Sequence, residues 1–315
     1  MPRRIASTEA VLRLPCQPPY DWAHSLAFLA RRALTGVERV DAAGYARTLA
    51  CMEEQVRIAV RPVPGEDALE LRVTGAPPSA LPLLERTARR VFDLPGDPAR
   101  IGGQLAADPL VGPLVAQRPG LRIPGAWDPF ECTVRAVLGQ QVSVAAGRTF
   151  AARLVGRCGE TLRAGGEGLT HLFPTPARLA QADLAGLGMS GARTAALKSL
   201  ALAVLGQRVD LSAAPADVTA ALAALPGIGP WTAQYVALRA LGEPDAFPHG
   251  DWVLRRMAAP PGAAPLGVRE LAERAQSWRP WRGYATIHLW HAAGELGARA
   301  ARGVPTRAAR AAPPA

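Results

Sequence analysis

The sequence is poor in lysine and in long apolar runs, and each shortage excludes a class of protein. Lys198 is the only lysine among 36 basic residues, so a mechanism that needs a lysine Schiff base depends on that one side chain. No segment approaches the roughly 20 consecutive apolar residues of a membrane span. The first residues, Met-Pro-Arg-Arg-Ile, contain no apolar core of a secretory signal. We therefore expect a cytoplasmic protein with no membrane partner.

Cysteine is also scarce, and its spacing excludes a common kind of metal site. The four cysteines stand far apart, at positions 16, 51, 132 and 158, and no two form a C-x-x-C pair. Zinc sites and iron–sulfur clusters use closely spaced cysteine or histidine ligands. We therefore expect no metal site of this kind, and four reduced thiols in a cytosolic chain.

Positive charge is abundant, and almost all of it is arginine. The net charge is +10 over 315 residues. Such a balance favours a polyanionic partner, because each phosphate that a basic side chain neutralises releases counterions. An arginine-rich composition can raise net charge without any function, so the charge supports a nucleic-acid partner only together with other signals.

Hydrophobic patterning divides the chain near residue 98. Residues 56–63 and 69–73 alternate apolar with charged side chains, as strands with one solvated face do. Asp21 can cap a helix that follows it, and further strands are expected over residues 37–40 and 45–51. Residues 1–98 are thus predicted to form an α+β domain with an antiparallel sheet.

From residue 99 to residue 300 the pattern is helical almost throughout, with proline and glycine in the connections. We expect no second β region there, so the protein should be mainly α. Residues 301–315 are rich in alanine, arginine and proline, and they are predicted to be a disordered tail.

A tight turn between two helices is predicted at residues 225–233, Leu-Pro-Gly-Ile-Gly-Pro-Trp-Thr-Ala. Pro226 fixes its backbone, and Gly227 and Gly229 adopt angles that other residues resist. Backbone amides near the start of the second helix suit a phosphate oxygen. Taken alone, the turn is equally well explained as an ordinary corner in a helical core.

Further along the chain, Asp251 precedes a second helix start in Phe-Pro-His-Gly-Asp-Trp-Val-Leu-Arg-Arg, and its simplest role is an N-cap. The hairpin followed by this aspartate resembles the signature of the helix-hairpin-helix DNA glycosylase superfamily. Residues 17–22, 127–144, 173–176 and 278–284 extend the resemblance to one branch of it, the AlkA-type 3-methyladenine DNA glycosylase II family. The matches run in order along nearly the whole chain.

This resemblance implies an N-terminal antiparallel-sheet domain followed by two helical helix-hairpin-helix glycosylase domains that flank the active cleft. It also implies a DNA glycosylase that excises alkylated purines such as 3-methyladenine and 7-methylguanine by base flipping. Asp251 would be the catalytic residue, because its carboxylate can stabilise positive charge that develops on the deoxyribose. Members that also cut the strand have a lysine where this chain has Trp231, so the enzyme should be monofunctional.

The resemblance places five aromatic residues in the pocket for the flipped base: Phe28, Trp231, Tyr235, Trp252 and Trp290. Each alone is as readily explained by the core. Together they suit a base that alkylation has made cationic, since aromatic faces attract cations. His24 stands where the family often has a further aromatic residue, which predicts a change in selectivity.

The DNA contacts follow from the same resemblance. The amides of Gly227 and Gly229 should bind a phosphate, and carbonyls of the hairpin could bind a sodium or potassium ion, with no cofactor required. In the loop at Gln140 and Gln141, the second residue matches the position that fills the gap left by the flipped nucleotide. A helix-terminal polar pair is the simpler reading of these two glutamines. The expected partner is double-stranded DNA with alkylated bases, bound by a nucleoid-associated monomer.

Two alternative functions stay open at this point. A bifunctional glycosylase/lyase for oxidised bases would share the fold, but Trp231 and the isolated Lys198 count against it. A non-catalytic DNA-binding protein could use the hairpin as a phosphate clamp alone, and Asp251 at the signature position counts against that.

Overall fold

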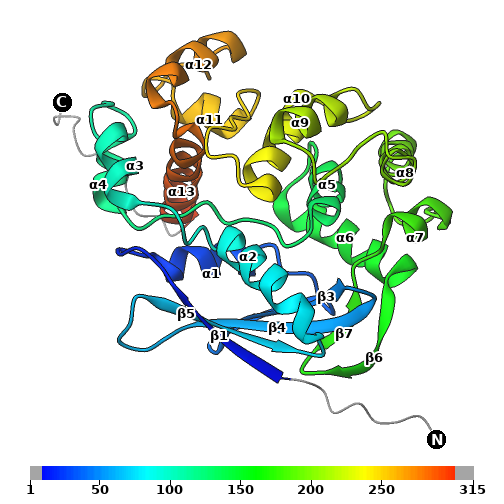
Figure 1. Cartoon of the computed structure of the whole chain (residues 1–315). Coiled ribbons are helices and arrows are strands. Elements are labelled where there is room, and N and C mark those ends of the chain that lie inside the picture. Colours follow the sequence, from blue (N-terminus) through cyan, green and yellow to red (C-terminus); the bar gives the residue numbers. More distant parts are fainter. Residues whose placement is uncertain (1–8, 302–315) are drawn as a thin grey trace, which may run out of the picture.

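The computed structural model describes residues 9–301, which form an antiparallel sheet followed by a helical region (Figure 1). Of the predicted disordered tail, residues 302–315 lie outside the described residues, and Ala301 ends the last helix. None of the described helices is long and apolar enough to cross a membrane. Within residues 9–301, no group of three or more histidine, cysteine or acidic side chains could hold a metal ion.

The predicted N-terminal sheet is confirmed, with five strands in the order β1-β5-β4-β3-β2. Its strands are β1 (Glu9–Pro15), β2 (Glu38–Asp41), β3 (Gly44–Cys51), β4 (Glu54–Pro62) and β5 (Ala68–Thr74). The alternation that predicted β4 is real, because Val56, Ile58 and Val60 are buried and the residues between them are more exposed. This apolar face packs against α1 (Trp22–Ala30) and, after the 3-10 turn η1 (Pro78–Ala80), α2 (Leu81–Val91).

Helix α1 connects the sheet to the functional region. As predicted, Asp21 caps it, and the Asp21 carboxylate accepts a hydrogen bond from the His24 amide at 2.8 Å. The helix buries His24 and Phe28 on one side. In Figure 1, α1 and α2 lie between the sheet and the other helices, so these side chains can reach the helical region.

The helical region contains two separate apolar cores. One is built by α5 (Pro129–Leu138), α6 (Val144–Cys158), α7 (Pro176–Gln181), α8 (Gly191–Leu205), α9 (Pro215–Ala223) and α10 (Pro230–Val236). The other is built by α3 (Pro98–Leu105), α4 (Gly112–Gln117), the π-helical turn η2 (Ala237–Leu241), α11 (Trp252–Met257), α12 (Val268–Arg274), the 3-10 turn η3 (Ala275–Trp278) and α13 (Arg282–Ala301). Figure 1 shows α4 beside α13, although the two are far apart in the chain.

The expectation of no second β region is wrong, because β6 (Glu160–Gly166) and β7 (Leu169–Leu172) form a hairpin between α6 and α7. The turn between them uses Glu167 and Gly168 with positive φ, at 54° and 80°. The hairpin docks on the N-terminal domain, where the Gly36 carbonyl accepts hydrogen bonds from the amides of Thr170 and His171. These contacts with a distant part of the chain stabilise the strand pair, which the short sequence of the hairpin does not predict by itself.

A buried ion-pair network joins the sheet domain to α5. Glu131 accepts hydrogen bonds from Arg47 at 2.6 Å and from Arg135 at 2.8 Å. Glu38 accepts from Arg135 and from the Tyr45 hydroxyl, each at 2.8 Å. The two arginines hold the Glu38 carboxylate in its charged form and lower its pKa although it is buried. Each of these charges therefore has a partner, as burial requires.

Candidate active site

The predicted hairpin connects α9 to α10. Gly227 has a φ of 81°, and a Cβ there would lie only 2.7 Å from the Cβ of Ala196, so the position requires glycine. Ile228 anchors the turn, because its side chain is buried and its amide donates to the Leu225 carbonyl at 3.1 Å. Gly227 and Gly229 are exposed, and neither amide donates a hydrogen bond to another described residue. Both are thus free to bind an anion.

Asp251 caps α11 and also faces a cavity. One carboxylate oxygen accepts from the Leu254 amide at 3.0 Å, which is the cap. The same oxygen accepts from the indole nitrogen of Trp290 at 3.2 Å, and the other accepts from that of Trp231 at 3.0 Å. Three N–H donors therefore fix the carboxylate. The helix-cap role and the predicted cavity role are compatible in one side chain.

The cavity beside Asp251 has a volume of about 970 Å³ and lies where the sheet domain meets both helical cores. Its wall includes side chains from α1, α5, α10 and α13. Four of the five aromatic residues predicted for the base pocket line it: Phe28, Trp231, Tyr235 and Trp290. Residues up to 262 positions apart in the sequence, which the resemblance assigned to one pocket, thus line one cavity.

The aromatic rings are arranged in two groups. Trp231 and Tyr235 are stacked, with centroids 5.3 Å apart and planes 19° from parallel, and Trp290 lies 6.1 Å from Tyr235. Phe28 instead has the guanidinium carbon of Arg32 3.7 Å from its ring centroid and that of Arg239 at 4.4 Å. Sequence reasoning missed both arginines, because arginine is too common in this chain for any one to stand out.

The prediction that Trp252 lines the base pocket is the one pocket assignment that the structure corrects. Its side chain is 63% exposed and does not line the cavity, whereas its neighbours Asp251 and Val253 do. Successive helical residues point about 100° apart, so a residue next to a cavity-facing position can point away from the cavity. Trp252 is the first residue of α11, where no earlier turn covers it.

The two glutamines of the loop after α5 have different roles. The Gln140 side chain donates to the Gly227 carbonyl at 3.0 Å and to the Thr232 hydroxyl at 2.9 Å, so it ties the loop to the hairpin. Gln141 is exposed and has a φ of 57°. The loop therefore presents Gln141 outward from a fixed base, as an inserted residue requires.

His24 and His291 form a direct contact in the cavity wall, with their Nδ1 atoms 3.1 Å apart. A guanidinium can only donate, so Arg118, 3.1 Å from Nε2 of His291, makes that nitrogen an acceptor. Neutral His291 then carries its proton on Nδ1 and donates to His24. The remaining N–H of His24, on Nε2, is buried without a partner. His24 thus adds a polar contact where an aromatic residue was expected from the family.

Burial and the neighbouring His291 lower the pKa of His24 to about 3 and that of His288 to about 4. Both imidazoles stay neutral in the folded protein, while the unfolded chain takes up protons below about pH 6.5. Folding stability should therefore fall as the pH falls from 6.5 toward 4. Burial raises the pKa of Asp93 to about 6, which opposes this loss in part, because a raised carboxyl pKa stabilises the fold at low pH.

We expect the free energy of unfolding to fall by roughly 2 kcal/mol between about pH 7 and about pH 5. Urea titrations across this range measure the slope. The variant His288→Leu should show a flatter pH dependence than the wild type. The control variant Leu202→Ala, at an exposed residue of α8 that carries no ionisable group, should keep the wild-type slope. Equal slopes for all three proteins would contradict the assignment.

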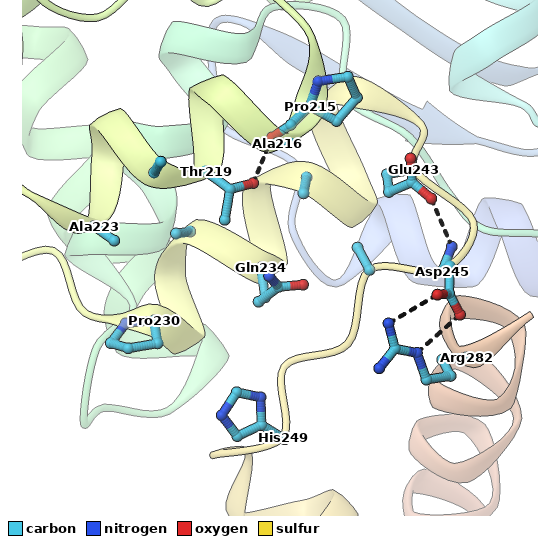
Figure 2. A pocket seen from close by; sticks show the side chains of 14 residues that line it. Pro215, Ala216, Thr219, Ala223, Pro230, Gln234, Glu243, Asp245, His249 and Arg282 are labelled. Carbon is cyan, nitrogen blue, oxygen red and sulfur yellow. Dashed lines mark hydrogen bonds and ion pairs between the residues drawn. The ribbon is translucent and has the colours of Figure 1, made fainter. Parts of the chain in front are cut away.

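A second, smaller cavity of about 500 Å³ lies on another side of the hairpin, between α9, α10 and the loop before α11 (Figure 2). Asp245 accepts two hydrogen bonds from Arg282 there, each at 2.8 Å, and its amide donates to Glu243. Its lining includes neither Asp251 nor an aromatic side chain other than His249. The chemistry expected of Asp251 therefore belongs to the larger cavity.

Comparison with known proteins agrees with this architecture. Residues 11–128 match the AlkA N-terminal domain, and residues 134–281 match the HhH-GPD superfamily of base excision DNA repair proteins. The chain is 41% identical over 285 residues to DNA-3-methyladenine glycosylase 2 of Escherichia coli, covering 88% of this chain and 96% of that protein.

Two further proteins show the same relationship at lower coverage or identity. A probable bifunctional transcriptional activator/DNA repair enzyme AlkA of Mycobacterium tuberculosis is 39% identical, over 89% of this chain and 56% of its own length. The solved 3-methyladenine DNA-glycosylase of Archaeoglobus fulgidus superposes with a TM-score of 0.76 at 19% identity, over 90% of this chain and 98% of that one, which shows a shared fold. The chain therefore belongs to the AlkA family of helix-hairpin-helix DNA glycosylases.

Proposed function

We propose that the protein is a monofunctional DNA glycosylase that excises alkylated purines such as 3-methyladenine and 7-methylguanine from double-stranded DNA. The observation that carries this proposal is the Asp251 carboxylate, which two indole N–H groups hold at an aromatic cavity beside the hairpin. The Asp251 carboxylate and the aromatic rings of the cavity all come from one chain, which supports action as a monomer. The substrate implies a site of action on the nucleoid in the cytoplasm.

The geometry supports electrostatic catalysis by Asp251. Breaking the N-glycosidic bond builds positive charge on the deoxyribose, and a fixed carboxylate next to the sugar stabilises that charge. An N-alkylated purine is cationic and already a good leaving group, so stacking in an aromatic cavity is enough to hold it. The duplex must release the nucleotide for the base to reach the cavity, and Gln141 would fill the gap.

Trp231 and Lys198 support a reaction without a covalent intermediate. Trp231 occupies the position of the lyase nucleophile, and its indole N–H donates to Asp251. The Lys198 ammonium donates to the carbonyls of Ala180 and Ala182, next to the end of α7. No described lysine is therefore present in the lining of the cavity to attack the sugar.

The hairpin supplies the expected phosphate contact through the exposed amides of Gly227 and Gly229. A sodium or potassium ion at the hairpin stays a prediction. The carbonyls of Leu225, Gly227 and Gly229 already accept hydrogen bonds from Ile228, Gln140 and Ala233, which leaves few oxygens for an ion. No step proposed here depends on it.

The test is incubation of the purified protein with a methylated duplex, with released base and strand cleavage followed separately. We expect free 3-methyladenine, strand breaks only after alkali, and no trapped protein–DNA adduct in borohydride, because no lysine attacks the sugar. Breaks without alkali together with a borohydride adduct would establish the bifunctional alternative. Tight binding with no released base would establish a non-catalytic DNA-binding protein.

A further inference from the structure

Trp252 is the one exposed aromatic side chain that the structure describes. It is 63% exposed, whereas the other tryptophans, tyrosines and phenylalanines are buried or partly buried. Among residues 9–301 its indole nitrogen has no hydrogen-bond partner, and no other aromatic ring lies against it. Trp231 and Trp290 contrast with it, since both donate to Asp251. An exposed aromatic ring next to the active site has a free face on which a flat ligand can stack.

The surroundings of Trp252 indicate which kind of ligand can reach it. Trp252 directly follows Asp251, whose carboxylate must meet the sugar of the flipped nucleotide for catalysis. The exposed amides of Gly227 and Gly229 open toward solvent on the hairpin that also carries Trp231. Gly250, two residues before Trp252, lies close to the start of α10, because a Cβ placed on Gly250 would lie 3.9 Å from the Cβ of Trp231. Trp252 therefore lies next to the groups that the DNA strand must reach.

Flipping a nucleotide out of the duplex leaves its neighbours without a stacking partner on one side. An aromatic side chain can replace that partner for any base, because every base has a π face. We propose that Trp252 stacks on a base beside the flipped nucleotide and acts as a DNA-binding residue outside the pocket. This inference rests on the proposed function only in that the DNA strand lies over Asp251.

The test compares Trp252→Ala and Trp252→Phe with the wild type, and Leu202→Ala serves as the control. Leu202, on α8, is similarly exposed at 55% but lies away from the cavity lining. The probe is a duplex with a tetrahydrofuran abasic analogue and 2-aminopurine beside it, so binding is measured without excision. Trp252→Ala should raise the Kd about tenfold and abolish the quenching of 2-aminopurine, because one stacking contact is lost. Trp252→Phe should restore most of both, and Leu202→Ala should match the wild type.

Excision at saturating DNA separates this role from a role in the pocket. Under single-turnover conditions Trp252→Ala should release 3-methyladenine from a methylated duplex at nearly the wild-type rate. An unchanged Kd, or a slow excision rate at saturation with normal Kd, would overturn the proposal and return Trp252 to the pocket. A wild-type protein that binds the analogue with quenching but releases no base would contradict the proposed enzymatic function and leave the stacking role standing.

Discussion

Replacing Asp251 with asparagine should slow base excision by about 10²- to 10³-fold while DNA binding changes little. Asparagine has nearly the same shape, and its carbonyl oxygen can still accept from the Leu254 amide and keep the cap. It carries no negative charge, so it cannot stabilise the positive charge that develops on the sugar. Its amide group also cannot accept from both indoles, because Trp231 and Trp290 donate to different carboxylate oxygens.

Single-turnover release of 3-methyladenine from saturating methylated duplex measures this effect, with the Kd determined on an abasic-analogue duplex. Asp217→Asn is the matched control, since Asp217 is exposed in the first turn of α9 on the same hairpin but is absent from the cavity wall. It should excise at the wild-type rate. An Asp251→Asn enzyme that kept more than about a tenth of the wild-type rate would remove Asp251 from the catalytic role.

The second large effect concerns stability. Glu131→Leu should lower the free energy of unfolding by about 3–5 kcal/mol, because it removes the close partner of the buried Arg47 guanidinium and one of the two partners of Arg135. Arg47 would lose its contact at 2.6 Å and keep only Glu38 at 3.9 Å, while Arg135 would retain Glu38. Leucine fills similar space, so the loss reports on charge rather than on a cavity.

Urea unfolding measures this loss, and Glu85→Leu provides the comparison. Glu85 also pairs with an arginine one helical turn away, Arg89, but that pair is partly exposed to solvent and should contribute less than about 1 kcal/mol. A loss in Glu131→Leu as small as that in Glu85→Leu would mean that water or rearrangement compensates the buried charges. The network would then not be what joins the sheet domain to α5.

Local chemistry explains which features could be predicted from the sequence. The hairpin depends on glycine and proline within a few residues, and Asp251 caps the helix that follows it, so both can be read from neighbouring positions. The strands of the first sheet carry their own alternation of apolar and charged side chains. Only the resemblance to a family assigned Phe28 and Trp290 to one pocket, because no local sequence pattern relates two residues so far apart.

The features that sequence reasoning missed depend on tertiary contacts. The β6–β7 hairpin donates hydrogen bonds to the carbonyl of Gly36, which is far away in the chain. The residues of the hairpin alone therefore do not predict it. The pairing of His24 with His291 spans 267 positions. Trp252 was assigned to the pocket from its position in a motif, but the direction of a side chain changes by about 100° from one helical residue to the next.

The arrangement of the second helical core has a consequence for synthesis of the protein. Helices α3 and α4 leave the ribosome well before α13, which belongs to the same apolar core. Until α13 follows, the apolar faces of α3 and α4 have each other but not the rest of their native core, so the growing chain carries an exposed apolar segment that chaperones can shield. Trp290 also lies on α13, so the cavity beside Asp251 is completed only after this helix has been made. A nascent chain that still lacks α13 therefore lacks one of the two indoles that hold the Asp251 carboxylate.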